Sequence, residues 1–220
     1  MTSSHPLLLA SGSPRRQQII QLLGLDVSIC VAPTDEDAMQ QKYQGPLEEL
    51  APWLAKHKAA AALTLPEAKG CTVIGADTTV LLDEQVLGKP RDKAHARELL
   101  LTLRGRTHYV VTGIAVSGFI NGKRKMLAAS CITPVQMRQY SVPEIKAYIA
   151  TGDPLDKAGA YGIQHPSFQP TRRIDGCYFN VVGLPLCTLV DLLAEFRIYP
   201  TRHGPNVEAG PCPWSEQCQI

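Results

Sequence analysis

Apolar and polar positions along the chain alternate between short buried runs and helical stripes. Leu7–Ala10 is an apolar run, which predicts a short buried strand. Ser13 follows as a good helix N-cap, and Pro14 fits the first position of a helix. Apolar residues then recur until Gly24, where the helix is predicted to end. The chain therefore opens with a strand that leads directly into a helix.

The middle of the chain predicts longer elements. A helical segment is expected over about 47–65. Thr72–Ala76 is typical of a buried strand, and Thr79–Leu82 continues extended. Asp92–Leu103 predicts a further helix, which stops before a glycine.

A hairpin is the clearest local signal. Two runs of strand-forming residues, Tyr109–Ile120 and Lys125–Met137, flank Asn121-Gly122. Asn-Gly is the strongest short signal for a two-residue hairpin turn. These residues predict a pair of long antiparallel strands.

The end of the chain returns to helices. Ser141 and Glu144 form a capping-box pattern, which predicts a helix that runs to Gly152. Leu184–Phe196 predicts a last helix. The alternation of strands and helices, with one long hairpin, indicates α/β or α+β architecture in one domain with a cleft.

The chain changes character near its end. From about Pro200 it is rich in Pro, Gly and polar residues and loses its periodicity. We therefore expect a single domain over residues 1–199 and a disordered C-terminal tail over residues 200–220.

Composition narrows the class of protein. At 220 residues the chain is long enough for one sizeable domain. A formal net charge of +2, without a run of lysine and arginine, argues against binding of a nucleic-acid polymer. No apolar stretch approaches the length of a membrane span, and no secretory signal is apparent. We expect a cytoplasmic enzyme or binding protein that does not associate with membranes.

The seven cysteines agree with that location. They are dispersed and include no C-x-x-C pair. An odd, dispersed set indicates thiols in a reducing compartment rather than a disulfide framework. Cys212 and Cys218 lie closest together, with His203 nearby, but the spacing of a four-ligand zinc site is absent.

Two arginines at the start of the first helix raise a question. Arg15 and Arg16 follow the predicted N-cap, where the helix dipole disfavours positive charge. Small residues, a helix start and two guanidiniums together make a site for a polyanion. The alternative is a pair of surface arginines that pair with nearby carboxylates, and local sequence favours neither reading. A P-loop pattern is absent from the chain.

Two lysines add to this charge. Lys58 falls on the apolar stripe of its predicted helix, and a lysine that faces a core needs a partner. Alternatively its stem covers apolar surface, or Pro52 breaks the helix and shifts its face. Lys89 is held between Gly88 and Pro90 in a loop after an extended segment.

Asp77 supplies a candidate acid. A near-continuous apolar run, "VIGA", leads directly into it. An acid at the end of a buried strand is suited to hold a divalent cation or to activate water. The alternative is a turn that Asp77 caps through Thr78 and Thr79. Four cationic groups and one acid together indicate a phosphorylated substrate with a metal.

Several motifs recur together in the order and spacing of a known family. "LASGSPRR", "ADTTV" with "GKP" downstream, and "DKAGAYGIQ" followed by "NVVGLPL" resemble the Maf family of nucleoside triphosphate pyrophosphatases, from about Leu8 to Phe196. The resemblance implies an α/β fold, similar to inosine triphosphatases, with a curved mixed β-sheet and helices in two lobes around a central cleft. It also implies hydrolysis of a nucleoside triphosphate to the monophosphate and pyrophosphate with a divalent cation, Mg²⁺ or Mn²⁺. Whether the protein forms a homodimer is not decided by the sequence.

The resemblance assigns roles to individual residues. It places the catalytic acid at Asp77, and whether this acid takes a proton or mainly holds the metal stays open. Metal ligands fall on Asp77 and on Glu36 in "APTDED", where Asp35 and Asp37 are alternative matches. Phosphate-binding groups fall on Ser11, Arg15, Arg16, Lys58 and Lys89. Positions tied to substrate choice correspond to Arg15, Thr78 and Gln164.

The string "AYGIQ" resembles the branch that acts on dTTP and UTP. The Gln164 amide offers one donor and one acceptor, which match the N3–H and O4 edge of uracil or thymine. His165 and Pro166 follow where the family has a glycine-rich turn, and Pro170 lies in the same loop. We interpret His165 as a solvated loop residue. Two alternatives remain: the same chemistry on 7-methyl-GTP, or a non-catalytic nucleotide-binding regulator of septum formation.

Overall fold

The computed structural model describes residues 6–200, and over these residues the core is a seven-stranded mixed sheet. The strand order is β2-β1-β3-β5-β6-β7, and β4 pairs with β3 beside this path. β1 pairs in parallel with β2 and β3, whereas the other pairs are antiparallel. The strands are β1 (Leu7–Ala10), β2 (Val27–Cys30), β3 (Thr72–Leu82), β4 (Gln85–Leu87), β5 (Thr107–Ile120), β6 (Lys123–Met137) and β7 (Thr171–Ile174).

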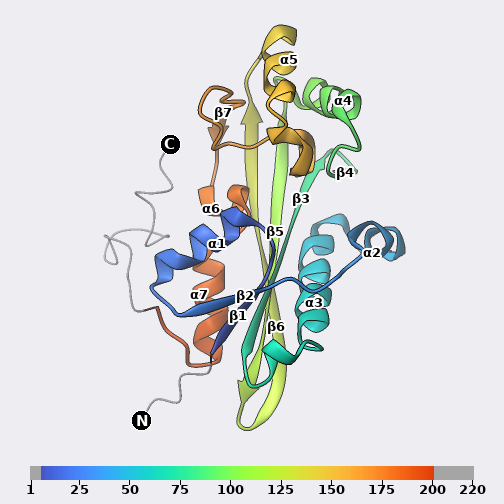
Figure 1. The fold of residues 1–220 in the computed structure, drawn as a ribbon. Helices are drawn as coiled ribbons and strands as arrows, with labels where there is room; N and C mark the ends of the chain where they lie inside the picture. Colours follow the sequence, from blue (N-terminus) through green and yellow to red (C-terminus); the bar gives the residue numbers. More distant parts are fainter. Residues whose placement is uncertain (1–5, 201–220) are drawn as a thin grey trace.

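Helices cover both faces of this sheet (Figure 1). α1, α6 and α7 lie on one side of the long strands, α3 lies on the other, and α4 and α5 lie at the upper end. The fold class predicted from the sequence, an α/β fold with a mixed sheet, is confirmed. The α-helices are α1 (Pro14–Ile20), α2 (Glu36–Lys42), α3 (Leu50–Ala62), α4 (Lys93–Leu103), α5 (Val142–Ala150), α6 (Tyr178–Val182) and α7 (Leu186–Glu195). Short 3₁₀ turns are η1 (Gln21–Leu23), η2 (Leu47–Glu49), η3 (Pro66–Ala68), η4 (Asp153–Asp156) and η5 (Ala158–Ala160).

Local signals placed several of these elements correctly. Asn121 and Gly122 both have positive φ, 51° and 75°, as the predicted hairpin turn between β5 and β6 requires. The Ser141 hydroxyl accepts from the Glu144 N–H, and the Glu144 carboxylate accepts from the Ser141 N–H, which completes the capping box of α5. Ser13 is the N-cap of α1, although its side chain makes no capping bond.

One expectation for the middle of the chain was wrong, and the structure excludes two of the alternatives. The two predicted extended segments form one strand, β3, so Asp77 lies inside a strand rather than at its end. Asp77 therefore does not cap a turn. Pro52 does not break α3, because it lies in the first turn, where a helical N–H has no intrahelical partner.

Close packing of α3 against the sheet positions one wall of the site. A Cβ atom on Gly75 of β3 would lie 2.4 Å from the Ala55 carbonyl oxygen, and one on Gly113 of β5 would lie 2.2 Å from the Pro52 nitrogen. Only glycine fits at these two positions, since both contacts are with backbone. The helix therefore lies directly on the strands, which brings Lys58 close to β3.

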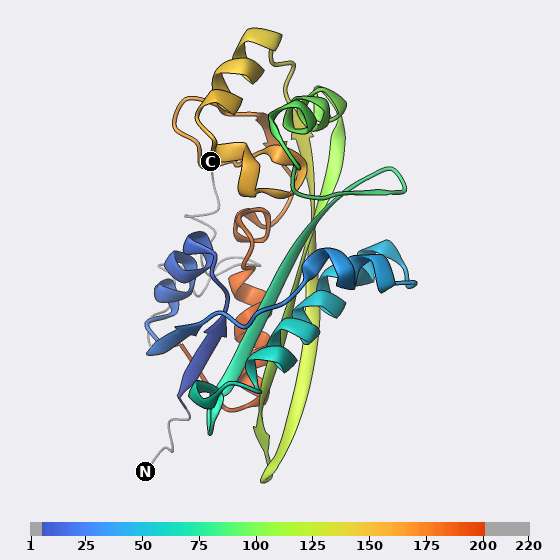
Figure 2. The same ribbon diagram turned by 45° about the vertical axis from the view of Figure 1, so that its right-hand side comes forward.

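The elements form two lobes that share the long strands (Figure 2). The lower lobe contains β1, β2, α1, α2, α3 and α7, and the upper lobe contains β4, β7, α4, α5, η4 and η5. β3 runs from the lower lobe into the upper lobe. β1 ends at Ala10, opposite Gly75, and β4 pairs with β3 only from Val80, so residues 76–79 of β3 have no paired strand on that side. Ligand sites in α/β sheets commonly lie at such carboxyl ends of parallel strands.

Some expectations concern residues outside the described range. The predicted tail, with Cys212, Cys218 and His203, lies beyond residue 200 and outside the described part of the chain. Among residues 6–200, no helix has the length and apolar character needed to cross a membrane.

Candidate active site

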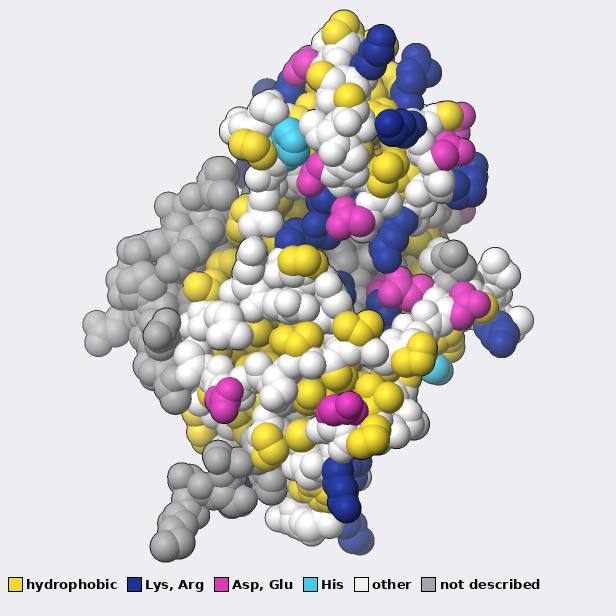
Figure 3. Space-filling model, viewed as in Figure 1, with side chains coloured by type: hydrophobic (Ala, Val, Ile, Leu, Met, Phe, Trp, Pro, Cys, Tyr) yellow, Lys and Arg dark blue, Asp and Glu magenta, His cyan; other side chains and the backbone are white. Residues whose placement is uncertain are grey.

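A large cleft of about 1680 Å³ opens between the two lobes. Figure 3 shows Lys, Arg, Asp and Glu side chains close together in the hollow between the upper and lower parts of the molecule. The structure brings to this one cleft all the residues to which the resemblance assigned a role. The cleft is lined by Ser11, Arg15, Arg16, Glu36, Lys58, Asp77, Thr78, Lys89 and Gln164.

Lys58 joins two carboxylates at the centre of the cleft. Its Nζ lies 2.5 Å from Asp77 Oδ1 and 2.7 Å from Glu36 Oε1. Lys58 and Asp77 are buried, whereas Glu36 is half-buried. Lys58 therefore faces inward and is paired, as its place on the apolar stripe predicted, and it does not merely cover apolar surface.

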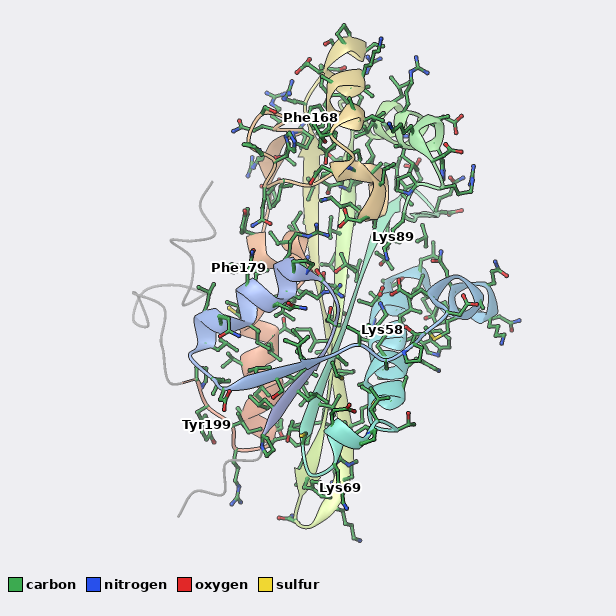
Figure 4. All side chains as sticks on the ribbon, in the orientation of Figure 1. Lys58, Lys69, Lys89, Phe168, Phe179 and Tyr199 are labelled. Carbon is green, nitrogen blue, oxygen red and sulfur yellow. The ribbon has the colours of Figure 1, made fainter. Side chains whose placement is uncertain are left out.

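Glu36 links the two lobes at this point. Its Oε2 also lies 3.3 Å from the Nζ of Lys89, which is on the loop after β4. Figure 4 shows Lys58 on α3 below and Lys89 above. Partial burial raises the pKa of Glu36, but the charges of Lys58 and Lys89 outweigh it and hold this pKa below its ordinary value. Glu36 is therefore a carboxylate at neutral pH.

Thr79 adds an unsatisfied oxygen to the same wall. It follows Asp77 by two positions on β3, so both side chains project from the same face of the strand. Thr79 lines the cleft and is buried, and among the described residues its hydroxyl oxygen has no hydrogen-bond partner. Sequence reasoning missed this hydroxyl.

The two arginines of α1 have different surroundings. Arg16 donates from Nε to the Gly183 carbonyl (2.8 Å), from Nη1 to the Ala76 carbonyl (2.9 Å) and from Nη2 to the Thr78 hydroxyl (2.9 Å). Burial lowers the pKa of Arg16, although the charge of Asp77 partly offsets this effect. Its guanidinium thus ties α1 to β3 and to the turn after α6.

Arg15 spans the mouth of the cleft. Its Nη1 lies 3.6 Å from Asp156 Oδ2 on η4, in the upper lobe. The neighbouring Lys157 also pairs with Asp156 (2.7 Å) and with Asp153 (2.9 Å). Arg15 to Asp156 and Lys89 to Glu36 are thus two ion pairs that cross between the lobes. Arg15 pairs with a carboxylate, as expected for the alternative of surface arginines, but this ion pair lies at the cleft.

Thr78 projects away from Asp77, on the opposite face of β3. Its hydroxyl contacts the Thr112 hydroxyl on β5 at 2.9 Å. Thr112 in turn bonds to Asn180 on α6. Sequence reasoning assigned no role to Thr112 or Asn180, although Asn180 lies in the motif "NVVGLPL" that carried the resemblance.

The loop with Gln164 is held by aromatic residues beneath it. Gln164 is exposed and lines the cleft. His165 is half-buried: its Nδ1 accepts from the Phe168 N–H (2.9 Å), and its ring packs edge-on against Tyr148. His165 is a loop residue, as expected, but it shapes the turn through this bond rather than lying free in solvent.

A buried histidine lies behind the same loop. His108 Nε2 lies 2.7 Å from the Tyr161 hydroxyl, and Tyr161 lines the cleft three positions before Gln164. Burial lowers the pKa of His108 to about 4, so the ring is neutral at neutral pH.

A mixed α/β sheet with a cleft of this charge pattern defines a class of protein suited to phosphorylated substrates. The family model described as "Maf-like protein" matches residues 6–196, and the chain belongs to this family.

Three curated relatives illustrate the similarity, and each is described as a dTTP/UTP pyrophosphatase. The relative from Salmonella typhimurium is 42% identical over 191 residues, which cover 87% of this chain and 93% of the relative. The relative from Desulforamulus reducens is 40% identical, with 88% and 98% covered. The relative from Dehalococcoides mccartyi is 37% identical, with 96% and 91% covered.

Proposed function

We propose that this protein hydrolyses dTTP and UTP to the nucleoside monophosphate and pyrophosphate, with the help of a divalent cation. The observation that carries the proposal is the pair of carboxylates, Asp77 and Glu36, that meet at Lys58 in a cleft lined by further cations. The named activity of relatives about 40% identical over most of the chain supports the same conclusion.

The triphosphate would bind where two ion pairs connect the lobes. Lys89 and Arg15 pair with carboxylates across the cleft, at 3.3 and 3.6 Å. Both pairs are partly exposed, and exposed ion pairs contribute only about 0–1 kcal/mol. Phosphate oxygens carry more charge and can therefore replace Glu36 and Asp156 as partners. Ser11 and Lys58 line the same path and contribute a hydroxyl and an ammonium group.

The residues present fit a divalent cation that is shared with substrate. Among the described residues, no three His, Cys, Asp or Glu side chains form a complete metal site. Mg²⁺ typically needs only one or two carboxylates, because water and substrate phosphates supply its other ligands. Glu36 and Asp77 provide the carboxylates, and the unpartnered Thr79 hydroxyl provides a further oxygen nearby. When bound, the cation supplies positive charge for the pyrophosphate that leaves.

Asp77 acts on the water that attacks the α-phosphorus. It accepts a proton from this water as the new P–O bond forms, and the bond to the bridging oxygen breaks to release pyrophosphate. Lys58 holds the Asp77 carboxylate in place at 2.5 Å. Arg16 adds positive charge behind Asp77 while its own hydrogen bonds go to the protein.

The test is a pyrophosphate-release screen over the common nucleoside triphosphates and 7-methyl-GTP with Mg²⁺ or Mn²⁺. We expect the highest kcat/KM for dTTP and UTP. Exclusive turnover of 7-methyl-GTP would transfer the same chemistry to another base. Nucleotide binding without any turnover would instead identify a non-catalytic regulator and refute the proposal.

A further inference from the structure

A chain of buried polar groups lies beneath Thr78. Thr112 and Asn180 are both 0% exposed. The Asn180 side chain accepts from the Thr112 N–H (3.0 Å) and donates to the Val110 carbonyl (2.9 Å) and to the Thr133 hydroxyl (2.8 Å). The proposed reaction uses neither residue. Buried polar groups that are fully hydrogen-bonded define one rigid arrangement.

The direction of each hydrogen bond in this chain follows from chemistry. The Thr112 hydroxyl has one proton, and it donates that proton to the backbone carbonyl oxygen of Asn180 at 2.8 Å. At the 2.9 Å contact between the Thr78 and Thr112 hydroxyls, Thr78 must therefore be the donor. On its other side, Thr78 accepts from the Arg16 guanidinium, which has no acceptor to offer.

Thr78 consequently presents no proton to the cleft. Its single proton goes to Thr112, and one lone pair goes to Arg16. A hydroxyl oxygen has two lone pairs, so one remains. Thr78 is half-buried and lines the cleft, and this remaining lone pair can only accept a hydrogen bond from a ligand.

We propose that Thr112 and Asn180 are positioning residues that make Thr78 an obligatory acceptor toward the nucleobase. The matching donor is the N3–H of the imide in uracil and thymine, which leaves the Gln164 amide to face O4 alone. Cytosine has an unprotonated N3 at that position. The Thr112 and Asn180 pair thus contributes to base selection without contact with the substrate. This inference rests on the proposed pyrimidine triphosphate hydrolysis.

The test is the variant Thr112→Val, which keeps the shape of the side chain and removes its hydroxyl. The Thr78 proton then lacks its acceptor and can turn toward the cleft, where it faces the N3–H of UTP. We expect the ratio of kcat/KM for UTP to that for CTP to fall by about tenfold or more, since a mismatched hydrogen bond in a polar site is costly.

A matched control separates this effect from a general loss of stability in the buried hydrogen-bond network. Thr133→Val removes a buried hydroxyl that also bonds to Asn180 but does not contact Thr78. Its UTP to CTP ratio should stay within about threefold of wild type, although its melting temperature falls as for Thr112→Val. Thr112→Ser restores the hydroxyl and should restore the ratio.

The outcomes distinguish this inference from the proposed function. An unchanged ratio in Thr112→Val, or an equal fall in Thr133→Val, would overturn the positioning role while leaving the hydrolase intact. A wild-type protein without turnover of any nucleotide would refute the proposed function instead. In that event the ratio of dissociation constants for UMP and CMP, measured by calorimetry in the same variants, supports or overturns the inference by the same criteria.

Discussion

Replacement of Asp77 by asparagine tests the centre of the proposed reaction. Asparagine is nearly isosteric, but it cannot accept the proton of the attacking water or bring negative charge to a cation. Asp77 is only 6% exposed and pairs with Lys58. The variant therefore changes charge and basicity at one buried position without a change of volume.

The structure sets the expected cost in stability. Removal of one partner from a buried ion pair typically costs about 3–5 kcal/mol, because the other charge is left alone. Lys58 keeps Glu36 at 2.7 Å in Asp77→Asn, so we expect a smaller loss in the free energy of unfolding, about 1–2 kcal/mol. The variant should therefore fold and still bind nucleotide.

Activity should fall far more than stability. Loss of a general base typically costs about a hundredfold or more, which corresponds to about 2.7 kcal/mol in the activation barrier. The assay is pyrophosphate release from UTP at saturating substrate, with nucleotide binding measured in parallel. Asp83→Asn is the control, since Asp83 directly follows β3 and pairs with exposed Arg106 outside the cleft. A kcat above about a tenth of wild type in Asp77→Asn would refute the role of Asp77.

The remaining predictions concern substrate binding, base selection, pH and the extent of the domain. Lys89→Ala should raise the KM for UTP by about tenfold through loss of a charge-assisted contact, whereas exposed Lys93→Ala, outside the cleft, should not; equal KM values would remove Lys89 from the phosphate site. Gln164→Glu should lower kcat/KM for UTP and dTTP much more than for CTP, because a carboxylate repels O4 but accepts from the amino group of cytosine, and a uniform drop would exclude Gln164 from base recognition. The pKa of His108 in the folded protein is about 4, below its ordinary 6.5, so the unfolded chain binds the extra proton and stability falls as pH decreases through this window. Urea titrations should show a decrease of about 2 kcal/mol between pH 6.5 and pH 5 that is absent from His108→Phe, and an equal pH dependence in both proteins would contradict this account. Truncation after Pro200 should leave kcat/KM for UTP nearly unchanged, and a large loss would place part of the active unit beyond that residue.

Elements defined by local chemistry were predictable from the sequence. The β5 and β6 hairpin depends on the two residues of its turn, and the start of α5 depends on Ser141 and Glu144. Short elements such as β4 and β7 were missed. Each has only three or four residues and is stabilised by pairing with a distant strand, which no local pattern shows.

The position of Asp77 shows the same limit within one strand. Local sequence predicted Asp77 at the end of a strand, with a turn through Thr78 and Thr79 as the alternative. Pairing with β5 overrides this preference: Asp77 lies opposite Gly113 and Thr78 opposite Thr112. Continuous pairing puts Asp77 and Thr78 on opposite faces of one strand, which separates the proposed hydrolytic acid from the hydroxyl that contacts Arg16 and Thr112.

The paired arginines at the start of α1 show why residue type alone could not assign the site. Adjacent residues of a helix project about 100° apart, so Arg15 and Arg16 cannot share one environment. Arg16 faces the sheet and gives three donors to Gly183, Ala76 and Thr78, segments that only the folded chain brings together. Arg15 faces the cleft mouth, where it pairs with Asp156 of the other lobe. The resemblance implies phosphate contacts for both arginines. From the contacts in the structure we propose separable tasks: Arg16 fixes the position of α1 against β3, and Arg15 can exchange its carboxylate partner for a substrate phosphate.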